Sequence, residues 1–61
     1  MIRRQDDGAL TILTLDRPDK ANSLTRAMLA DLVGHLRDTR DRQALILTGT
    51  GKVFSAGADL D

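Results

Sequence analysis

Four small residues near the end of the chain, Ser55-Ala56-Gly57-Ala58, are the stretch best suited to chemistry, and Asp59, Leu60 and Asp61 follow them. Small side chains let a ligand approach the backbone N–H groups closely, and acidic residues after them are typical of a helix start. Free N–H groups of this kind bind anions or stabilise an oxyanion. By composition alone, close packing is the commoner explanation of such a stretch, so both interpretations stay open here.

A second segment, Gly49-Thr50-Gly51-Lys52, raises the alternative of a phosphate-binding loop. Such a loop needs a longer glycine-spaced cradle with Ser or Thr after its lysine, and here Val53 follows Lys52. The sequence therefore favours this alternative less than an oxyanion site. Because His35 is the only histidine and the chain has no cysteine, we expect no metal site. We expect His35 to be a solvated helix residue.

Two longer stretches carry a more specific pattern. Residues 47–60 read Leu-Thr-Gly-Thr-Gly-Lys-Val-Phe-Ser-Ala-Gly-Ala-Asp-Leu, and residues 15–24 read Leu-Asp-Arg-Pro-Asp-Lys-Ala-Asn-Ser-Leu. Each resembles an N-terminal hallmark of the crotonase family, the enoyl-CoA hydratases and isomerases, and the two occur in the same order and at about the same separation. The resemblance covers nearly the whole chain, and it implies an acyl-CoA thioester as the substrate.

The resemblance implies that the backbone N–H of Ala58 is one of two donors of an oxyanion hole. Attack at the β-carbon of an acyl-CoA, or proton removal at its α-carbon, moves negative charge onto the thioester oxygen. Two N–H donors aimed at that oxygen stabilise the charge. The second donor in the family is a glycine N–H much further along, which these 61 residues do not contain.

Two segments are also implied to line the site for coenzyme A, which is part of the substrate, so no separate cofactor is expected. The resemblance implies eight contact residues: Lys20, Ala21, Ser23, Ala56, Gly57, Ala58, Asp59 and Leu60. Around them, Asp16, Arg17 and Asn22 are expected to shape the loop. We expect Asp59 to be a helix-start acid instead of a general base.

No acid–base pair can be named in this chain. Hydratases of the family use two glutamates well beyond residue 61, whereas all nine acidic residues here are aspartates. Hydration, dehydration, isomerisation, hydrolysis and decarboxylation all occur on this scaffold, and the N-terminal motifs are shared among them. The resemblance therefore implies the substrate class and leaves the reaction open. It also implies two partners: the remainder of the same domain, and further copies in a trimer or hexamer.

The strands that must position these motifs follow from the hydrophobic pattern. Residues 2–5 and 9–15 are predicted to form a hairpin around a turn at residues 6–8. The second of these strands is apolar on both faces, which predicts that it is covered on both sides. The uncharged apolar run at residues 44–47 predicts a buried strand.

A helix is predicted between these strands, with Thr25 as its N-cap. Apolar residues at i, i+3, i+4 and i+7 predict one buried stripe, formed by Leu29, Leu32, Val33 and Leu36. The charged residues that follow, 38–42, are predicted to be a solvated turn. The order β-β-α-β predicts an α/β fold with a parallel crossover, and the resemblance implies the N-terminal portion of a crotonase-like (ClpP/crotonase) fold.

Length and composition predict that residues 1–61 are the N-terminal part of a single domain, incomplete on its own. A 61-residue chain without disulfides buries only about 60% of its unfolded surface, so its stability alone is marginal. A formal net charge of zero gives no support for a nucleic-acid partner, and no apolar run approaches a membrane span. We expect no secretory signal and a cytoplasmic location. The alternative is a truncated, non-catalytic chain that serves only as an interaction or structural piece.

Overall fold

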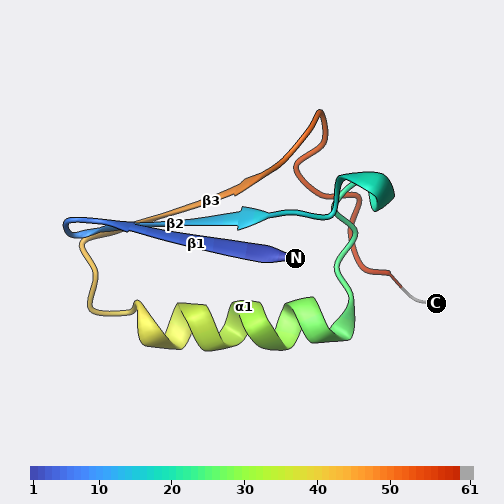
Figure 1. Ribbon diagram of the computed structural model, residues 1–61. Helices are drawn as coiled ribbons and strands as arrows, with labels where there is room; N and C mark the ends of the chain where they lie inside the picture. Colours follow the sequence, from blue (N-terminus) through green and yellow to red (C-terminus); the bar gives the residue numbers. More distant parts are fainter. Residues whose placement is uncertain (60–61) are drawn as a thin grey trace.

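The computed structural model describes residues 1–59, which form a three-stranded sheet and one long helix (Figure 1). The elements are β1 (Ile2–Asp7), β2 (Leu10–Leu15), the short 3₁₀ helix η1 (Pro18–Lys20), α1 (Arg26–Asp38) and β3 (Ala44–Gly49). β1 pairs antiparallel with β2, and β2 pairs parallel with β3. The predicted order β-β-α-β is confirmed. No helix within residues 1–59 has the length and apolar character needed to cross a membrane.

A two-residue loop, Gly8-Ala9, joins β1 to β2. Gly8 has a φ of +60°, a conformation that glycine adopts without steric cost and that tight hairpin turns use. The turn is shorter than predicted because Asp6 and Asp7 belong to β1 and pair with Thr11 and Leu10. The hairpin itself is confirmed, and its register fixes which residues of β1 share a face with those of β2.

β2 is buried on the face that carries its odd-numbered residues. Thr11 and Leu13 are 0% exposed and Leu15 is 1% exposed, whereas the other face of the strand is only half-buried. α1 lies along the buried face (Figure 1) and contributes Met28, which is 1% exposed. The prediction that β2 is covered on both faces is therefore confirmed for one face only, within residues 1–59.

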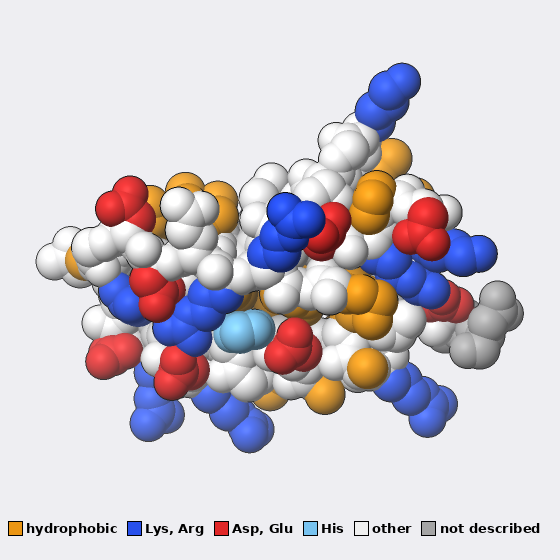
Figure 2. All heavy atoms as spheres, in the orientation of Figure 1, with side chains coloured by type: hydrophobic (Ala, Val, Ile, Leu, Met, Phe, Trp, Pro, Cys, Tyr) orange, Lys and Arg blue, Asp and Glu red, His pale blue; other side chains and the backbone are white. Residues whose placement is uncertain are grey.

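α1 begins as predicted but turns a different stripe toward the sheet. The Thr25 hydroxyl accepts a hydrogen bond from the Met28 N–H at 3.1 Å and so caps the helix. The buried or half-buried positions recur at i, i+4, i+7 and i+11: Met28, Leu32, His35 and Thr39. Three residues of the predicted stripe, Leu29, Val33 and Leu36, are instead 41%, 45% and 42% exposed. The predicted stripe lay one residue too far along the helix, and Figure 2 shows hydrophobic side chains exposed along the lower rim of the molecule, on the outer side of α1.

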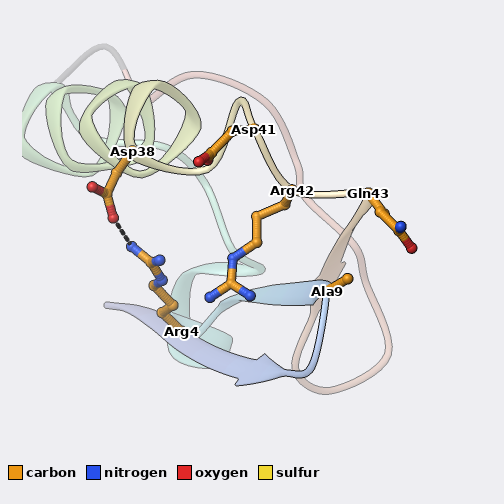
Figure 3. A pocket seen from close by; sticks show the side chains of 6 residues that line it. All are labelled: Arg4, Ala9, Asp38, Asp41, Arg42 and Gln43. Carbon is orange, nitrogen blue, oxygen red and sulfur yellow. Dashed lines mark hydrogen bonds and ion pairs between the residues drawn. The ribbon is translucent and has the colours of Figure 1, made fainter.

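A hollow of about 480 Å³ lies between the end of α1 and the hairpin (Figure 3). Its lining is mostly charged or polar and consists of Arg4, Ala9, Asp38, Asp41, Arg42 and Gln43. None of the residues implied by the resemblance to contact CoA lies among them. The hollow is therefore a feature of how the helix meets the sheet and is separate from the candidate site.

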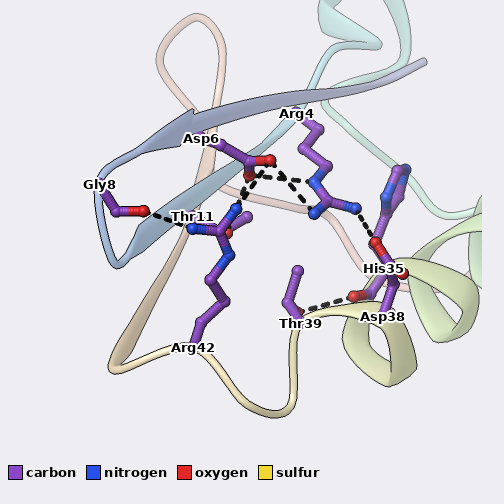
Figure 4. Close-up of polar contacts among 8 residues, drawn as sticks. All are labelled: Arg4, Asp6, Gly8, Thr11, His35, Asp38, Thr39 and Arg42. Carbon is purple, nitrogen blue, oxygen red and sulfur yellow. Dashed lines mark hydrogen bonds and ion pairs between the residues drawn. The ribbon is translucent and has the colours of Figure 1, made fainter.

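Charged side chains beside this hollow tie β1 to the end of α1 and to the connector after it (Figure 4). Arg4 lies 3.1 Å from Asp6 and 2.5 Å from Asp38, and Arg42 lies 3.0 Å from Asp6. The hydrogen bond from Arg4, followed by that from Thr11, holds the pKa of the Asp6 carboxyl below its usual value. The connector is a turn as predicted, with Arg40 and Asp41 exposed, but Asp38 and Arg42 pair with β1 and are not simply solvated.

We expect the isolated chain to melt without a sharp two-state transition. Only three hydrophobic side chains are buried among residues 1–59: Leu13, Leu15 and Met28. A core of this size rarely offsets the conformational entropy lost on folding. Circular dichroism of the 61-residue chain, recorded in dilute buffer during heating, measures the transition. A sharp cooperative melt would show that the chain is sufficient by itself.

Candidate functional site

The two motif-bearing segments, residues 15–24 and 47–59, meet beyond the ends of β2 and β3 (Figure 1). The Leu24 N–H donates to the Gly57 carbonyl at 2.8 Å, and the Asp59 N–H donates to the Leu24 carbonyl at 2.9 Å. These two bonds form a parallel bridge between Leu24 and Ala58. The structure therefore brings together the two segments that the resemblance implied for one site.

Ala58 differs from its neighbours in having an N–H that donates no hydrogen bond within the described residues. The other N–H groups of residues 56–59 are paired: Ala56 with the Ala21 carbonyl at 3.0 Å, Gly57 with the Ser55 hydroxyl at 3.1 Å, and Asp59 with the Leu24 carbonyl. In a parallel bridge of this pattern, Ala58 directs its own N–H away from Leu24. One free donor is thus held between two hydrogen-bonded neighbours.

The helix start predicted for these residues does not include Ala58, and a start after Asp59 lies outside the described residues. Ala58 is extended in the bridge, and the preceding Gly57 has a φ of +103°, which a residue with a side chain would resist. The bonds to Leu24 on either side of Ala58 explain the difference, because they hold the segment as a short strand. Leu60, also implied to contact CoA, lies outside the described residues.

A groove of about 570 Å³ opens beside Ala58. Its lining combines the start of α1 with the bridged segments: Leu24, Thr25, Arg26, Ala27, Leu29, Ala58 and Asp59. Among these lining residues, Arg26 is the one cation. A largely apolar concavity with a few polar groups is typical of small-molecule sites. Arg26 was not predicted as a site residue, although its place directly after the N-cap Thr25 was a usable signal.

The buried side chain of Asn22 connects the two segments by hydrogen bonds to both of them. Its side chain is 0% exposed, accepts from the Arg17 N–H at 2.8 Å, and donates to the carbonyls of Thr50 at 2.9 Å and Val53 at 2.8 Å. The main-chain carbonyl of Asn22 accepts from the Ser55 hydroxyl at 2.9 Å. The expectation that Asn22 shapes its own loop is confirmed, and its contacts to residues 50–55 were missed by the sequence reasoning.

Gly49 allows the second segment to approach Asn22 closely. A Cβ atom at Gly49 would lie 2.5 Å from the Phe54 carbonyl oxygen and 2.8 Å from the Asn22 side-chain nitrogen, distances that no side chain tolerates. The glycine therefore serves packing between the two motifs. Within residues 50–59 no helix follows Lys52, whereas a phosphate-binding loop leads into one, so the structure does not support that alternative.

Arg17 joins the start of the first segment to the end of the second. Its guanidinium lies 2.8 Å from the Asp59 carboxylate and donates to the carbonyl and the hydroxyl of Ser23, both at 3.0 Å. The Arg17 and Asp59 side chains are 18% and 21% exposed, so solvent screens the pair only in part. Asp16 pairs with Arg3 at 2.7 Å. Arg17 and Asp16 therefore fix the loop as expected, and Asp59 pairs with Arg17. Any helix that begins after Asp59 lies outside the described residues.

The family model for enoyl-CoA hydratase/isomerase matches residues 5–61. The chain belongs to this family. It is 38% identical over 60 residues to "Probable enoyl-CoA hydratase 1, peroxisomal" from Arabidopsis thaliana, in a match that covers 93% of the chain and 23% of that protein. It is also 36% identical over 56 residues to enoyl-CoA delta isomerase 2 from Rattus norvegicus, covering 88% of the chain and 14% of that protein.

A solved structure shares the fold of this hydratase/isomerase-family chain. The crystal structure of enoyl-CoA hydratase from Mycobacterium tuberculosis H37Rv superposes with a TM-score of 0.89 at 35% identity, covering 97% of this chain and 28% of that one. The chain thus spans about a quarter of the length of these hydratases and corresponds to the N-terminal part of the crotonase fold. The predicted fold class is confirmed, and a purely structural role is not favoured.

The first segment of this family member carries an unusual backbone at the candidate site. Ala21 and Asn22 have φ values of 51° and 57°, a left-handed conformation that costs free energy for residues other than glycine. The five hydrogen bonds of Asn22, which include one from its main-chain N–H to the Arg17 carbonyl, offset that cost. Lys20, at the end of η1, is exposed. No group of three or more potential metal ligands occurs in the part of the chain that the structure describes.

Proposed function

We propose that this chain forms the N-terminal part of an acyl-CoA-binding enzyme of the hydratase/isomerase type and supplies one oxyanion donor, the N–H of Ala58. One observation carries the proposal. Of the N–H groups of residues 56–59, that of Ala58 alone has no acceptor within residues 1–59, while its neighbours are bonded and Ala58 itself lines the groove. A donor fixed in advance costs no reorganisation when charge develops on a thioester oxygen.

The bonded neighbours restrict which backbone groups are free to bind CoA. The Ala56 N–H and the Gly57 carbonyl are already used by the first segment. The proposed CoA contacts of Ala56 and Asp59 are therefore made through other groups than these bonded ones, and Gly57, whose N–H and carbonyl are both bonded, contributes close approach because it has no side chain. In the first segment, the exposed Lys20 ammonium is the group that suits a phosphate of CoA.

The remaining catalytic groups come from outside these residues. A second donor and an acid–base pair are needed to complete a reaction on an enolate, and the chain contains no glutamate. The relatives reported above include both hydratases and an isomerase, so the proposal specifies the substrate class and not the reaction. A trimeric or hexameric assembly is part of the same family-based proposal, and a cytoplasmic location stays a prediction from the sequence.

Binding of acyl-CoA is tested with a chimera in which residues 1–61 replace the matching segment of the M. tuberculosis hydratase. We expect isothermal titration with acetoacetyl-CoA to show saturable binding. In the chimera, the M. tuberculosis protein supplies the rest of the site, and residues 1–61 supply the groove and the free Ala58 N–H. The M. tuberculosis protein without its matching segment is the control and should not bind. A folded chimera that gives no heat and no competition at millimolar ligand would remove the acyl-CoA assignment.

A further inference from the structure

The groove beside Ala58 contains one arginine, Arg26, whose charge is not used by the fold. Arg26 is exposed, and within residues 1–59 its guanidinium forms no ion pair. The one acid that lines the groove, Asp59, has its carboxylate 2.8 Å from the guanidinium of Arg17. Arg26 therefore gives the groove a positive charge that no carboxylate of the described residues neutralises.

Arg26 also occupies a position in α1 that does not favour a cation. It is the first residue of the helix, directly after the N-cap Thr25, and the first turn carries no acid. The N-terminal end of a helix is the positive end of its dipole, so a cation there is repelled. Arg37 has the usual arrangement, because it lies in the last turn, where the dipole attracts a cation. A residue that breaks such a local rule, with no compensating contact in the fold, is typical of functional sites.

The lining of the groove indicates which part of an acyl-CoA would meet Arg26. Ala58, the proposed donor to the thioester oxygen, lines the groove, whereas none of the first-segment residues proposed to contact CoA does so. In an acyl-CoA, the whole pantetheine arm separates the thioester from the phosphates, but the acyl group begins at the thioester carbon itself. An anionic group that meets Arg26 therefore belongs to the acyl group and not to CoA.

The other side chains of the groove suit a short acyl chain. Leu24, Ala27 and Leu29 are apolar, and Leu29 is 41% exposed, so apolar surface is open to a ligand. The start of α1 lies next to residues 58–59 (Figure 1), which brings this surface and Ala58 into one groove. Arg26 adds a planar guanidinium, a group that binds a carboxylate through two parallel hydrogen bonds.

We propose that Arg26 is a specificity-determining residue that selects acyl-CoA substrates whose acyl group carries a carboxylate at its far end. The inference rests on the proposed function, because it takes the Ala58 N–H as the donor to the thioester oxygen. The methylene groups of the acyl chain lie against Leu24 and Leu29, and the terminal carboxylate pairs with Arg26. The substrate class is thereby narrowed from acyl-CoA in general to the monothioesters of dicarboxylic acids.

Isothermal titration of the chimera with pairs of saturated thioesters tests the assignment. Succinyl-, glutaryl- and adipyl-CoA are each compared with the thioester in which a primary amide replaces the terminal carboxylate. We expect at least one dicarboxylic thioester to bind about tenfold or more tightly than its own amide. Arg26→Gln should abolish this preference and leave the affinity for the amide unchanged, whereas Arg26→Lys, which keeps the charge, should retain part of it. Arg37→Gln, at the other end of α1, is the matched control and should leave the preference intact.

Three results would overturn the role of Arg26. They are the lack of any preference in the parent chimera, a preference that survives Arg26→Gln, and an equal loss of affinity for acid and amide, which would mean that Arg26 binds CoA itself. Acetoacetyl-CoA, titrated into the same samples, separates this inference from the proposed function, because it should bind the parent and Arg26→Gln alike. If it binds and no preference is seen, only the specificity is wrong. If it does not bind a chimera that circular dichroism shows to be folded, the acyl-CoA assignment is wrong as well.

Discussion

Replacing the Gly57–Ala58 amide with an ester in the chimera should lower kcat by about a hundredfold or more. The ester removes the Ala58 N–H and keeps the shape of the backbone, and one oxyanion donor contributes about 2.7–4 kcal/mol to transition-state stabilisation. Because the interaction forms mainly in the transition state, kcat and kcat/KM should fall together. Semisynthesis with lactic acid in place of Ala58, followed by steady-state kinetics, measures the effect.

The matched control places the same lactic acid at Ala56. The N–H of Ala56 donates to the Ala21 carbonyl, so its loss should reduce stability by about 1 kcal/mol and leave kcat within a few-fold of the parent. If both esters lower kcat equally, the loss reflects packing of the segment. An Ala58 ester that keeps the parent kcat would show that the free N–H has no catalytic role.

Asn22→Ala should lower the free energy of unfolding of the chimera by about 3 kcal/mol or more. The substitution removes a fully buried side chain that bonds the Arg17 N–H and the carbonyls of Thr50 and Val53. Each net hydrogen bond is worth about 0.5–1.5 kcal/mol, and each partner left buried and unpaired adds about 1–3 kcal/mol. Urea unfolding of the parent and the variant gives the difference.

Two further variants separate the bonding of Asn22 from its mere size. Asn22→Asp keeps the shape but turns a donor into an acceptor that faces two carbonyl oxygens, so it should be at least as destabilising as Asn22→Ala. Asp19→Ala, at an exposed position in η1, should change stability by less than about 0.5 kcal/mol. A stable Asn22→Asp chimera would contradict the role given to the donor bonds.

Local patterns were enough to predict the three strands and the helix α1. The capping hydroxyl of Thr25, the turn glycine at position 8 and the apolar run before Gly49 each act within a few residues, so their consequences can be read from neighbours in the chain. The order of strands and helix followed from them. The buried stripe of α1 was placed one residue off because Met28 and Leu29 are both apolar, and periodicity alone does not decide between them.

The candidate site depends on contacts between distant residues, which no local pattern encodes. Leu24 meets Ala58 across the fold, and this bridge is why Ala58 is extended instead of helical. Asn22 was expected to act within its own loop because side-chain amides often bond nearby backbone. Its two donors instead reach Thr50 and Val53. The resemblance predicted which segments belong together, and the structure supplies the geometry.

The most direct test of the central claim is a crystal structure of the chimera with bound acetoacetyl-CoA. The account predicts the thioester oxygen at about 2.7–3.1 Å from the Ala58 nitrogen, the range of a donor that stabilises an oxyanion. It also predicts that the bonds from Leu24 to Gly57 and from Asp59 to Leu24 persist in the complex. A thioester oxygen bound elsewhere, with the Ala58 N–H paired to protein or to water alone, would contradict it.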